Sequence, residues 1–505
     1  MKKILLTTIT VLLAVALNAQ VSVWDGTAEP WTKGSGTPDD PYLIESAQNF
    51  AYLAEKTNEV HYANYNYHDM FVDTCFLLTA DLDLGGSEGH IWIPIAQDGM
   101  GYTTYCFGGN FDGANHTISN LLLKDGNGRK YMGLFGHANG GYIKNIVLDG
   151  DMIIIPSFHM SGIPGGLGLI IGFGENVEVE NCVNSFDVTC ERISFEMGGS
   201  IGGLFGKMQN AFIQNCHNYG NITVQNVNSM YSAVSCGGIV GNLTACEMTE
   251  CSSRGSIQMH GGDSYLAEKV SCGGIAGTMS GTLTNCYNNG DLTVAVHKAD
   301  PAQGLDRNAG GLFGSCYSDD ELIVTNSYGV SDIVIVADDE PYNMGGIVGF
   351  VKNAVQTTID NCYYLNTIES GNDYGTPKSE DEMKSEEFIG LLNADEEVFF
   401  MDTYGYLNDG FPILKWQHES HVGVDETDWQ GNVAVYPNPV QSLVTVSGEN
   451  LKELEVLNIL GQPVLKTGCS GESVTIDLAG QPAGVYFIKI TDKNGNKYSE
   501  KVVRE

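Results

Sequence analysis

The sequence is poor in basic residues and in long apolar runs. Its 505 residues include 25 Lys and Arg against 62 Asp and Glu, which gives a formal net charge of −37. A chain with this charge repels polyanions, so we expect no binding to nucleic acid or to anionic lipid surfaces. Beyond the N-terminal segment, no run reaches the roughly 18 apolar residues of a membrane span, so no transmembrane segment is predicted.

Proline is also scarce, whereas glycine is abundant. The chain has 14 Pro and 63 Gly, and hydrophobic residues make up 42% of it. Glycine without a collagen-like period is typical of many tight turns, and hence of short strands. The hydrophobic fraction excludes a disordered acidic polymer, and the length predicts two or more domains.

Residues 1–19 have the pattern of a signal peptide. Lys2 and Lys3 precede an apolar stretch, and a cleavage site follows with Ala19 as the last residue removed and Gln20 as the first mature residue. The sequence therefore predicts export from the cytoplasm.

The middle of the chain repeats one pattern seven times, at steps of 34 to 41 residues. The equivalent positions, which we call the anchors, are Asn145, Asn181, Asn215, Glu250, Asn285, Asn326 and Asn361. An apolar residue lies two positions before each anchor, and apolar residues follow seven and nine positions after most of them. Upstream of each anchor is a Gly-apolar-apolar-Gly unit, such as Gly203–Gly206, or a degenerate copy of it.

This spacing places the apolar side chains on one face of short strands. A single repeat cannot bury that face, whereas stacked repeats bury it in columns while each coil pairs with the next. We therefore predict an all-β fold: a right-handed parallel β-helix with short capping helices, followed by a small C-terminal β-sandwich. The glycines are expected to supply positive φ or close backbone approach.

The repeat resembles the GLUG repeat of secreted bacterial surface proteins, and the resemblance extends over roughly residues 22–418. It implies a surface protein but no particular activity, because such repeats occur in proteins of differing activity. We divide this region into an N-terminal cap with the first coils (20–132), the repeats (133–369), a C-terminal cap (370–418) and an acidic linker (419–431). Helices are expected over Ser46–Thr57 and after the capping box Ser379–Glu382.

Residues 432–505 alternate in the manner of a small β-sandwich. They resemble the type A C-terminal sorting domain of the type IX (Por) secretion system, and the residues that carry the resemblance include Tyr436, Pro437, Asn438, Pro439, Gly461, Gly484 and Tyr486. The resemblance implies a partnership with the type IX secretion machinery, passage across the outer membrane, removal of the domain and attachment of the rest to the cell surface.

Thirteen cysteines in an exported chain favour disulfides. Five of them share one repeat position, which holds Ile146 and Ser327 in other copies: Cys182, Cys216, Cys251, Cys286 and Cys362. Stacked β-carbons about 4.8 Å apart exceed the disulfide mean of about 3.8 Å. Buried reduced thiols are therefore predicted, with some disulfides or a metal site as the alternatives.

Candidate chemistry is sparse, and no cofactor is predicted apart from a possible Ca²⁺ at Asp81 and Asp83, for which a turn role is the alternative. Ser200 lies in a Gly-x-Ser-x-Gly string, but at a repeat boundary rather than in a nucleophile elbow. The run His418–His421 lacks the His-Glu-x-x-His order and is interpreted as a solvated tail. The Tyr-rich segment 61–68 is interpreted as loop packing, with sugar stacking as the alternative.

Two function classes remain. The first is a surface-attached adhesin or ligand-binding rod without catalytic residues, whose ligand is a host glycan or matrix protein. The second is a polysaccharide lyase or glycoside hydrolase, because parallel β-helices host both. Those reactions need catalytic groups converging on one face, such as two carboxylates about 5–10 Å apart. The sequence identifies no such pair, and the first class is favoured.

Overall fold

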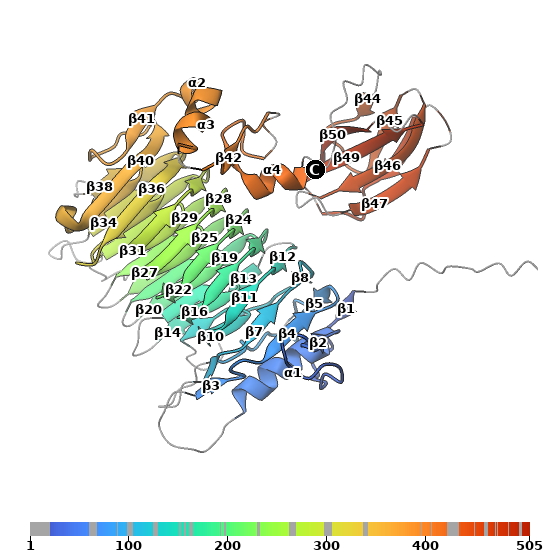
Figure 1. Cartoon of the computed structure of the whole chain (residues 1–505), viewed down its shortest axis with the longest axis horizontal. Helices are drawn as coiled ribbons and strands as arrows, with labels where there is room; N and C mark the ends of the chain where they lie inside the picture. The colour runs from blue at the N-terminus through green and yellow to red at the C-terminus, as the bar shows by residue number, and fades with distance from the viewer. Residues whose placement is uncertain are drawn as a thin grey trace, which may run out of the picture.

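The structure is a computed structural model of the chain. It describes residues 21–59, 68–97, 105–124, 130–150, 153–155, 158–160, 165–191, 193–195, 198–229, 233–261, 269–296, 306–336, 342–421 and 434–504, apart from 88, 395, 404, 406, 449, 459–462, 470, 472, 483 and 494–496. Figure 1 shows a rod of stacked strands followed by a small β domain, which confirms the predicted fold class. The predicted signal peptide and its cleavage site at Ala19 and Gln20 lie outside the described residues.

The rod is a parallel β-helix of about seven turns, and its strands fall into four stacks. Stack one contains β10 (Phe135–Asn139), β16 (Ile171–Glu175), β22 (Phe205–Gln209), the first parts of β27 (Val240–Thr249) and β31 (Ala276–Thr284), β35 (Phe313–Cys316) and β39 (Val348–Val351). Stack two contains β11 (Tyr142–Lys144), β17 (Glu178–Glu180), β23 (Phe212–Gln214), the later parts of β27 and β31, β36 (Leu322–Gly329) and β40 (Thr357–Leu365). Short strands continue stack two beyond the anchors: β12 (Val147–Leu148), β18 (Val183–Asn184), β24 (His217–Asn218), β28 (Ser252–Ser253) and β32 (Tyr287–Asn288).

The two remaining stacks complete each coil. Stack three contains β13 (Ile153–Ile155), β14 (Phe158–Met160), β19 (Val188–Cys190), β20 (Ile193–Phe195), β25 (Ile222–Ser229), β29 (Ile257–Gly261), β33 (Leu292–Ala295) and β37 (Ile333–Ile335). Stack four contains β9 (Tyr131–Met132), β15 (Gly165–Gly168), β21 (Gly199–Gly202), β26 (Val234–Gly237), β30 (Lys269–Gly273), β34 (Asp306–Gly310) and β38 (Tyr342–Gly345). The segments that vary between repeats join stack three to stack four.

The N-terminal coils have short strands and include the predicted helix. Their strands are β1 (Ser22–Val23), β2 (Tyr42–Ile44), β3 (His68–Met70), β4 (Cys75–Leu78), β5 (Leu82–Asp83), β6 (Tyr105–Phe107), β7 (Asn110–Asp112) and β8 (Thr117–Ser119). Helix α1 (Ala47–Asn58) starts at Ser46, whose hydroxyl accepts the Asn49 N–H. Its apolar face buries Phe50 and Leu53 against the end of the core, and Phe50 stacks on Trp92 at 4.9 Å.

The pairing register reproduces the predicted columns. Ile143 pairs with Val179, which pairs with Ile213, and the column continues through Met248, Leu283, Val324 and Ile359. The first copy differs downstream, because Ile153 and Ile155, not Met152 and Ile154, lie opposite Val188 and Cys190. The turn between β12 and β13 therefore contains one residue more than in the next coil, which sequence alignment of the copies missed.

The anchors occupy a left-handed corner. All seven have φ between 49° and 56°, a conformation that Asn tolerates better than most residues. Their amides form a ladder in which Asn181 Nδ2 donates to Asn145 Oδ1 (3.0 Å) and Asn215 Nδ2 donates to Asn181 Oδ1 (3.1 Å). Glu250 interrupts it because a carboxylate has no N–H to donate, and buried Asn215 Oδ1 is left without a partner. The predicted positive φ thus belongs mainly to Asn and not to the Gly-apolar-apolar-Gly unit.

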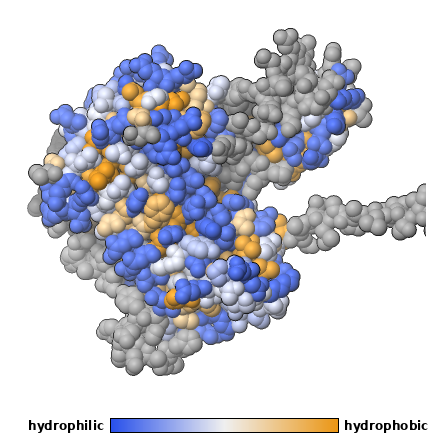
Figure 2. Space-filling model, viewed as in Figure 1, coloured by the Kyte–Doolittle hydropathy of each residue, from blue (hydrophilic) through white to orange (hydrophobic). Residues whose placement is uncertain are grey.

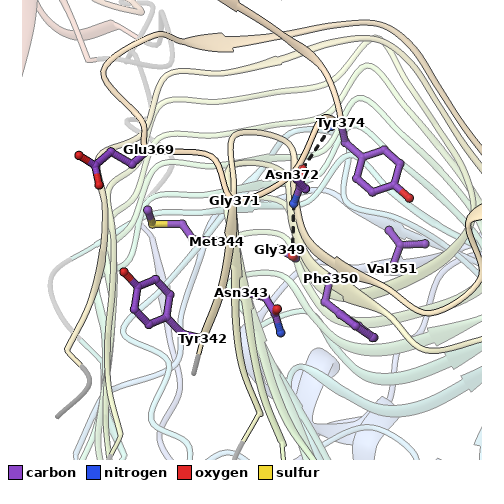
Figure 3. Close-up of a pocket in the computed structure, with 10 residues that line it drawn as sticks. All are labelled: Tyr342, Asn343, Met344, Gly349, Phe350, Val351, Glu369, Gly371, Asn372 and Tyr374. Atoms are coloured by element: carbon purple, nitrogen blue, oxygen red, sulfur yellow. Dashed lines mark hydrogen bonds between the residues drawn. The ribbon is translucent and has the colours of Figure 1, made fainter. Parts of the chain in front are cut away.

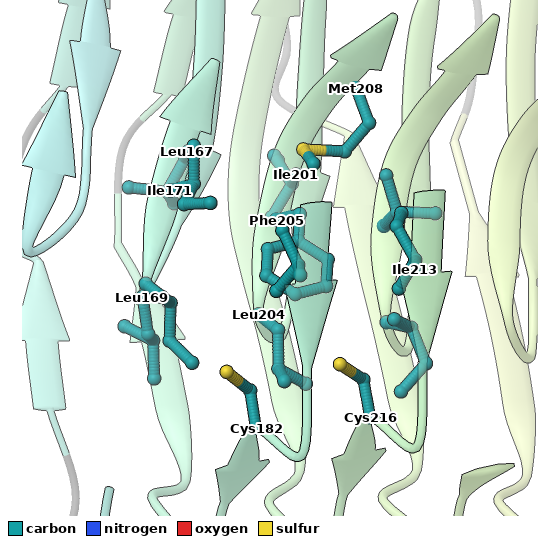
Figure 4. Close-up of a cluster of buried hydrophobic side chains, with 14 of the residues drawn as sticks. Leu167, Leu169, Ile171, Cys182, Ile201, Leu204, Phe205, Met208, Ile213 and Cys216 are labelled. Atoms are coloured by element: carbon teal, nitrogen blue, oxygen red, sulfur yellow. The ribbon is translucent and has the colours of Figure 1, made fainter. Parts of the chain in front are cut away.

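That unit forms a bend in which stack four turns inward to stack one. A β-carbon added to Gly206 would lie 2.5 Å from Leu167 N and 2.6 Å from Gly166 C, so only glycine allows the two backbones to pack this closely. Because the bend points into the rod, Leu169 and Leu204 at its tip reach the core, where they are buried (Figure 4).

The segment after the last coil has two parts. Residues Thr376–Lys378 (β41) pair with β40 at the end of the stack. Residues 380–421 lie against the side of the rod and contain α2 (Glu380–Met383), with the predicted capping box, α3 (Glu386–Leu392), β42 (Phe399–Phe400), β43 (Ile413–Leu414) and α4 (Lys415–His421); the short helix η1 (Ala354–Gln356) precedes them.

The contact with the side of the rod combines a buried apolar cluster, which includes Tyr328, Met383 and Phe388, with hydrogen bonds and stacked rings. Tyr287 donates to Gln417 Oε1 (2.9 Å), and the ring of Trp416 stacks on His217 at 3.8 Å. The run His418–His421, interpreted from sequence as a solvated tail, is the end of helix α4, and His418 stacks on Phe400 at 4.5 Å. The helix continues three residues into the predicted linker.

The C-terminal domain is a sandwich of two antiparallel sheets. One contains β44 (Ala434–Tyr436), β45 (Leu443–Ser447) and β48 (Ser473–Asp477), and the other contains β47 (Pro463–Gly468), β46 (Leu451–Leu457), β49 (Gly484–Asp492) and β50 (Lys497–Arg504). Apolar residues such as Val444, Val456 and Ile488 form a core of its own.

Replacing Glu250 with Asn is expected to complete the amide ladder. Asn suits φ +53° and supplies the missing donor to Asn215 Oδ1, so Glu250→Asn should raise the free energy of unfolding by about 0.5–1.5 kcal/mol. Urea unfolding of the full chain measures the change. Glu247→Asn, on an exposed strand position nearby, is the control, and equal effects of the two substitutions would contradict the ladder.

At Gly206 in the inward bend, we expect that no residue with a β-carbon fits without loss of stability. Gly206→Ala is expected to cost more than about 3 kcal/mol, because the methyl group meets backbone that cannot move without separating β15 from β22. Gly390→Ala is the matched control: it lies in α3 with no atom within 4 Å and should gain about 0.5–1 kcal/mol. Thermal unfolding distinguishes them, and a tolerated Gly206→Ala would refute the close approach.

Candidate functional site

The two walls of the inward bend meet along a line that we call the polar seam. Small polar side chains of stacks four and one fill it, and Ser235, Ser271 and Ser315 are buried there. Ser271 and Ser315 hydroxyls lie 2.6 Å apart, and Asn308 Nδ2 donates to the Tyr317 hydroxyl at 2.8 Å. The middle of the seam is therefore closed by hydrogen bonds between its own side chains.

At the last coil the seam opens into a cavity of about 320 Å³, which we call the end cavity (Figure 3). Its lining comes from β38, β39 and the segment that follows the last coil: Tyr342, Asn343, Met344, Gly349, Phe350, Val351, Glu369, Gly371, Asn372 and Tyr374. Gly371 N–H donates to Met344 O (2.7 Å) and Asn372 Nδ2 donates to Val348 O (2.8 Å). These bonds occupy acceptors that a further coil would use.

Aromatic rings surround the end cavity. Tyr342 is 50% exposed, and Phe350 packs against Tyr317 with ring centres 5.1 Å apart. Lys269 Nζ lies 3.8 Å from the centre of the Tyr317 ring, and burial raises the pKa of Tyr317 to about 12. The hydroxyls of Tyr342 and Tyr374 make no hydrogen bond to any residue that the structure describes, so both are available to a ligand.

Asn343 is held in place by its neighbours. It donates an N–H to Asn308 Oδ1 (2.8 Å), and Asn308 in turn donates to Tyr317. An amide has two donors and one acceptor, so the Asn343 oxygen and its second N–H remain for a ligand. Among the described residues, Glu369 is the one charged residue that lines the cavity, and Figure 3 shows it at the margin.

The other end of the seam also carries aromatic rings. His137 stacks on Phe173 at 4.7 Å, Tyr131 lies 5.0 Å from Phe173, and Lys207 Nζ lies 5.0 Å above the same ring. Burial, with Lys130 and Lys207 nearby, lowers the pKa of His137 to about 4. His137 is therefore neutral at physiological pH.

A second hollow of about 570 Å³ lies on the outside of the rod. Its lining residues are Asn210, Ala211, Phe212, Ala245, Cys246, Glu247, Gly281, Thr282, Asp320 and Glu321. The three carboxylates among them are exposed, and the lining includes no basic residue.

Asp83 makes the hydrogen bond of a local turn, whereas Asp81 bonds to the next coil. Asp81 Oδ1 accepts the Thr117 N–H (2.9 Å) and lies 3.1 Å from His116 Nδ1, and Asp83 Oδ1 accepts the Gly85 N–H (2.8 Å). Within the described ranges, no three His, Cys, Asp or Glu residues are placed to hold a metal ion. Calcium binding at these two residues stays an untested prediction.

The cysteines are free thiols. All thirteen lack a disulfide partner and twelve are buried. In the column, Cys182 and Cys216 direct their sulfurs to carbonyl oxygens of Glu180 (3.4 Å) and Gln214 (3.3 Å) rather than to each other (Figure 4). Burial raises the pKa of Cys362 to about 12, so it does not form a thiolate nucleophile.

The remaining predicted site residues have structural partners or fall outside the described residues. Ser200 is on strand β21, within hydrogen-bond distance of Ser235, and not at a nucleophile elbow. In the C-terminal domain, Asn438 Oδ1 accepts the Val503 N–H (2.9 Å) and Tyr486 donates to Pro482 O (2.8 Å). The peptides before Pro437 and Pro439 are cis. Gly461 and nearly all of the Tyr-rich segment 61–68 lie outside the described residues, and Gly484 begins β49.

Comparison with known families identifies the C-terminal domain. Residues 434–505 match the family model of the secretion system C-terminal sorting domain. The domain indicates secretion through a type IX system and attachment to the cell surface. No helix among the described residues is long and apolar enough to cross a membrane.

Curated proteins resemble the chain only locally. It is 37% identical over 75 residues to an endo-acting ulvan lyase of Formosa agariphila, which is 14% of each chain. It is 28% identical over 207 residues to halomucin of Haloquadratum walsbyi, covering 37% of this chain and 2% of that one. A candidate immunoglobulin A1 protease of Bacteroides ovatus, known from its crystal structure, aligns with a TM-score of 0.42 at 20% identity, over 76% of this chain and 95% of that one. The chain thus spans at most about a seventh of these two curated relatives.

Sequence reasoning missed the end cavity. Phe350 occupies the column that holds Ser315 in the preceding coil, whereas Tyr342 lies opposite Arg307 and Asn343 opposite Asn308. An aromatic residue that replaces a small polar one in the last copy is the signal that would have indicated the site.

The low pKa of His137 predicts acid sensitivity. Because the folded-state pKa, about 4, is below the unfolded value of about 6.5, the neutral form stabilises the fold, and this stability is lost as pH falls from about 6.5 towards 4. His137→Phe retains a ring against Phe173 but cannot be protonated. The melting temperature of the wild type should fall relative to that of His137→Phe between pH 7 and 4.5, and parallel curves would disprove the assignment.

Proposed function

We propose that the chain is a surface-attached rod that binds a ligand in its end cavity and catalyses no reaction there. The observation that carries the proposal is the cavity itself, where aromatic faces, a held amide and two tyrosine hydroxyls without a partner among the described residues surround an open space. Such a mixture of apolar and few polar groups is typical of ligand sites. The sorting domain supports display of this site outside the cell.

The chemistry of the lining supports binding over catalysis. Glycosidic bond cleavage by the usual routes needs an acid and a second carboxylate, and Glu369 is the one carboxylate at this cavity. The face seen in Figure 2 is mainly hydrophilic with smaller apolar patches, as expected of a rod exposed to water.

A lyase or glycoside hydrolase is the second candidate. The outer hollow favours it, because Glu247, Asp320 and Glu321 lie together on its lining. The likeness to the ulvan lyase spans 75 residues, close to the length of the sorting domain, and adds little to this candidate.

We further propose that residues 1–19 are removed as a signal peptide and that the repeats belong to the GLUG type. The proposed boundaries remain 20–132, 133–369, 370–418 and 419–431, with the sorting domain at 432–505. A host glycan or matrix protein is the proposed partner, and the regular pairing of the coils supports the repeat assignment.

Binding and turnover on one array decide between the two candidates. The full chain without residues 1–19 is applied to immobilised glycans and host matrix proteins, and bound protein and released product are both measured. We expect retention on one ligand class without shortened product. Release of shortened glycan, lost in Glu247→Gln but not in Glu369→Gln, would overturn the proposal in favour of the outer hollow, and absence of retention would also contradict it.

A further inference from the structure

We propose that the end cavity recognises an uncharged or amino sugar unit of a glycan, which rests on the proposed binding function and names its ligand class. A volume of about 320 Å³ is at the small end of the usual range for ligand pockets, about 300–1,000 Å³. It suits a small ring-shaped group.

The lining offers partners both to the apolar face of a sugar ring and to its hydroxyl groups. A pyranose ring offers a face of C–H groups and a rim of hydroxyls. The half-exposed ring of Tyr342 offers an apolar surface to the C–H face, with Met344 beside it (Figure 3). The Asn343 amide and the Tyr374 hydroxyl offer both donors and acceptors to the sugar hydroxyls.

The polar groups are positioned before the ligand arrives. The chain of hydrogen bonds from Asn343 to Asn308 and on to Tyr317 fixes the amide, and Tyr317 is itself packed between Phe350 and Lys269. Asn372 accepts the Tyr374 N–H (3.2 Å), which holds the start of that side chain. Side chains that are already fixed lose less conformational entropy when a ligand binds. This raises the affinity, which matters most for a weakly binding ligand such as a sugar.

Charge selects among sugars. The lining holds one charged group, the Glu369 carboxylate, and the whole chain carries a net charge of −37. A uronic or sulfated sugar would therefore be repelled both at the cavity and at long range. An uncharged sugar escapes this cost, and the ammonium of an amino sugar would gain from it.

A peptide strand is the main alternative occupant, and the backbone argues against it. Strand addition needs free N–H and C=O groups at the edge of a sheet. At this end, Gly371 and Asn372 already bond to Met344 O and Val348 O, so the residues after the last coil take this edge.

Calorimetry with defined tetrasaccharides tests the inference. The full chain without residues 1–19 is titrated with tetramers of glucose, mannose, galactose and N-acetylglucosamine, and with the galacturonic acid tetramer. We expect saturable binding of at least one uncharged tetramer and at least tenfold weaker binding of the acidic one. Tighter binding of the acidic tetramer, or binding of none of the uncharged ones, would overturn the inference.

Variants then place the binding in the end cavity. Tyr342→Ala should weaken binding at least tenfold and Tyr342→Phe should retain most of it, because the ring face is kept. Asn343→Asp adds a charge and should weaken binding, and Ile93→Ala, an exposed apolar residue of the N-terminal region, is the control. Binding that survives Tyr342→Ala would exclude this cavity.

The two proposals fail separately. Retention on a matrix protein without any sugar binding would refute the ligand class and leave the binding function standing, provided that Tyr342→Ala weakens the retention. No retention on any ligand would refute both.

Discussion

The rod depends on hydrogen bonding between successive coils in register, because this pairing places every side chain directly above its own counterpart. Successive residues of a column lie about 4.8 Å apart, so a column accepts only side chains that can pack against similar side chains above and below. Asn does so at the anchors because one amide both donates and accepts, as Asn181 does between Asn145 and Asn215. Ile and Cys do so through apolar contact. A charge does not, and at Glu250 the ladder stops, with Gln214 donating to the carboxylate at 3.3 Å instead. Burial also raises the pKa of Glu250, because a charged carboxylate is unfavourable at this partly buried position.

The inward bend adds a second constraint, and together the two leave little room for a binding site inside the stack. Glycine at positions such as Gly206 brings stacks one and four into contact, and small side chains then close the polar seam. Each coil covers the seam of its neighbour, so the seam can open only where the stack ends. At the N-terminal end Tyr131, His137 and Phe173 fill it, and at the C-terminal end the cavity remains. The negative charge stays outside the core: among the described residues Asp402 is the one buried carboxylate, and Glu178, Glu180 and Glu247 are exposed on strands.

The features that recur along the sequence could be predicted from it, and the structural features that occur only once could not. The Ile143 column, the parallel β-helix and the sorting domain were recoverable because each pattern occurs several times or matches a known domain. The extra residue before Ile153 was missed because residues 152–155 are all apolar, so either alternating set fits the pattern of the other copies. The packing of 380–421 on the rod was unpredictable because its contacts, such as Tyr287 with Gln417, join residues 130 positions apart without any shared pattern. The end cavity belongs to this second kind: it forms where the last copy departs from the others.

That departure also explains how a repetitive rod can carry a specific site. A substitution in an inner coil must fit neighbours on both sides, so Ser315 is confined to a small polar group that bonds within the seam. The last coil has a neighbouring repeat on one side only, and the segment that covers its other side does not follow the repeat pattern. Phe350 can therefore be large where Ser315 is small, and 369–374 can be shaped around it, without disturbing any coil below. A large side chain in the last coil therefore disturbs the fold little, whereas a side chain of the same size in an inner coil would have to displace a neighbouring β-strand.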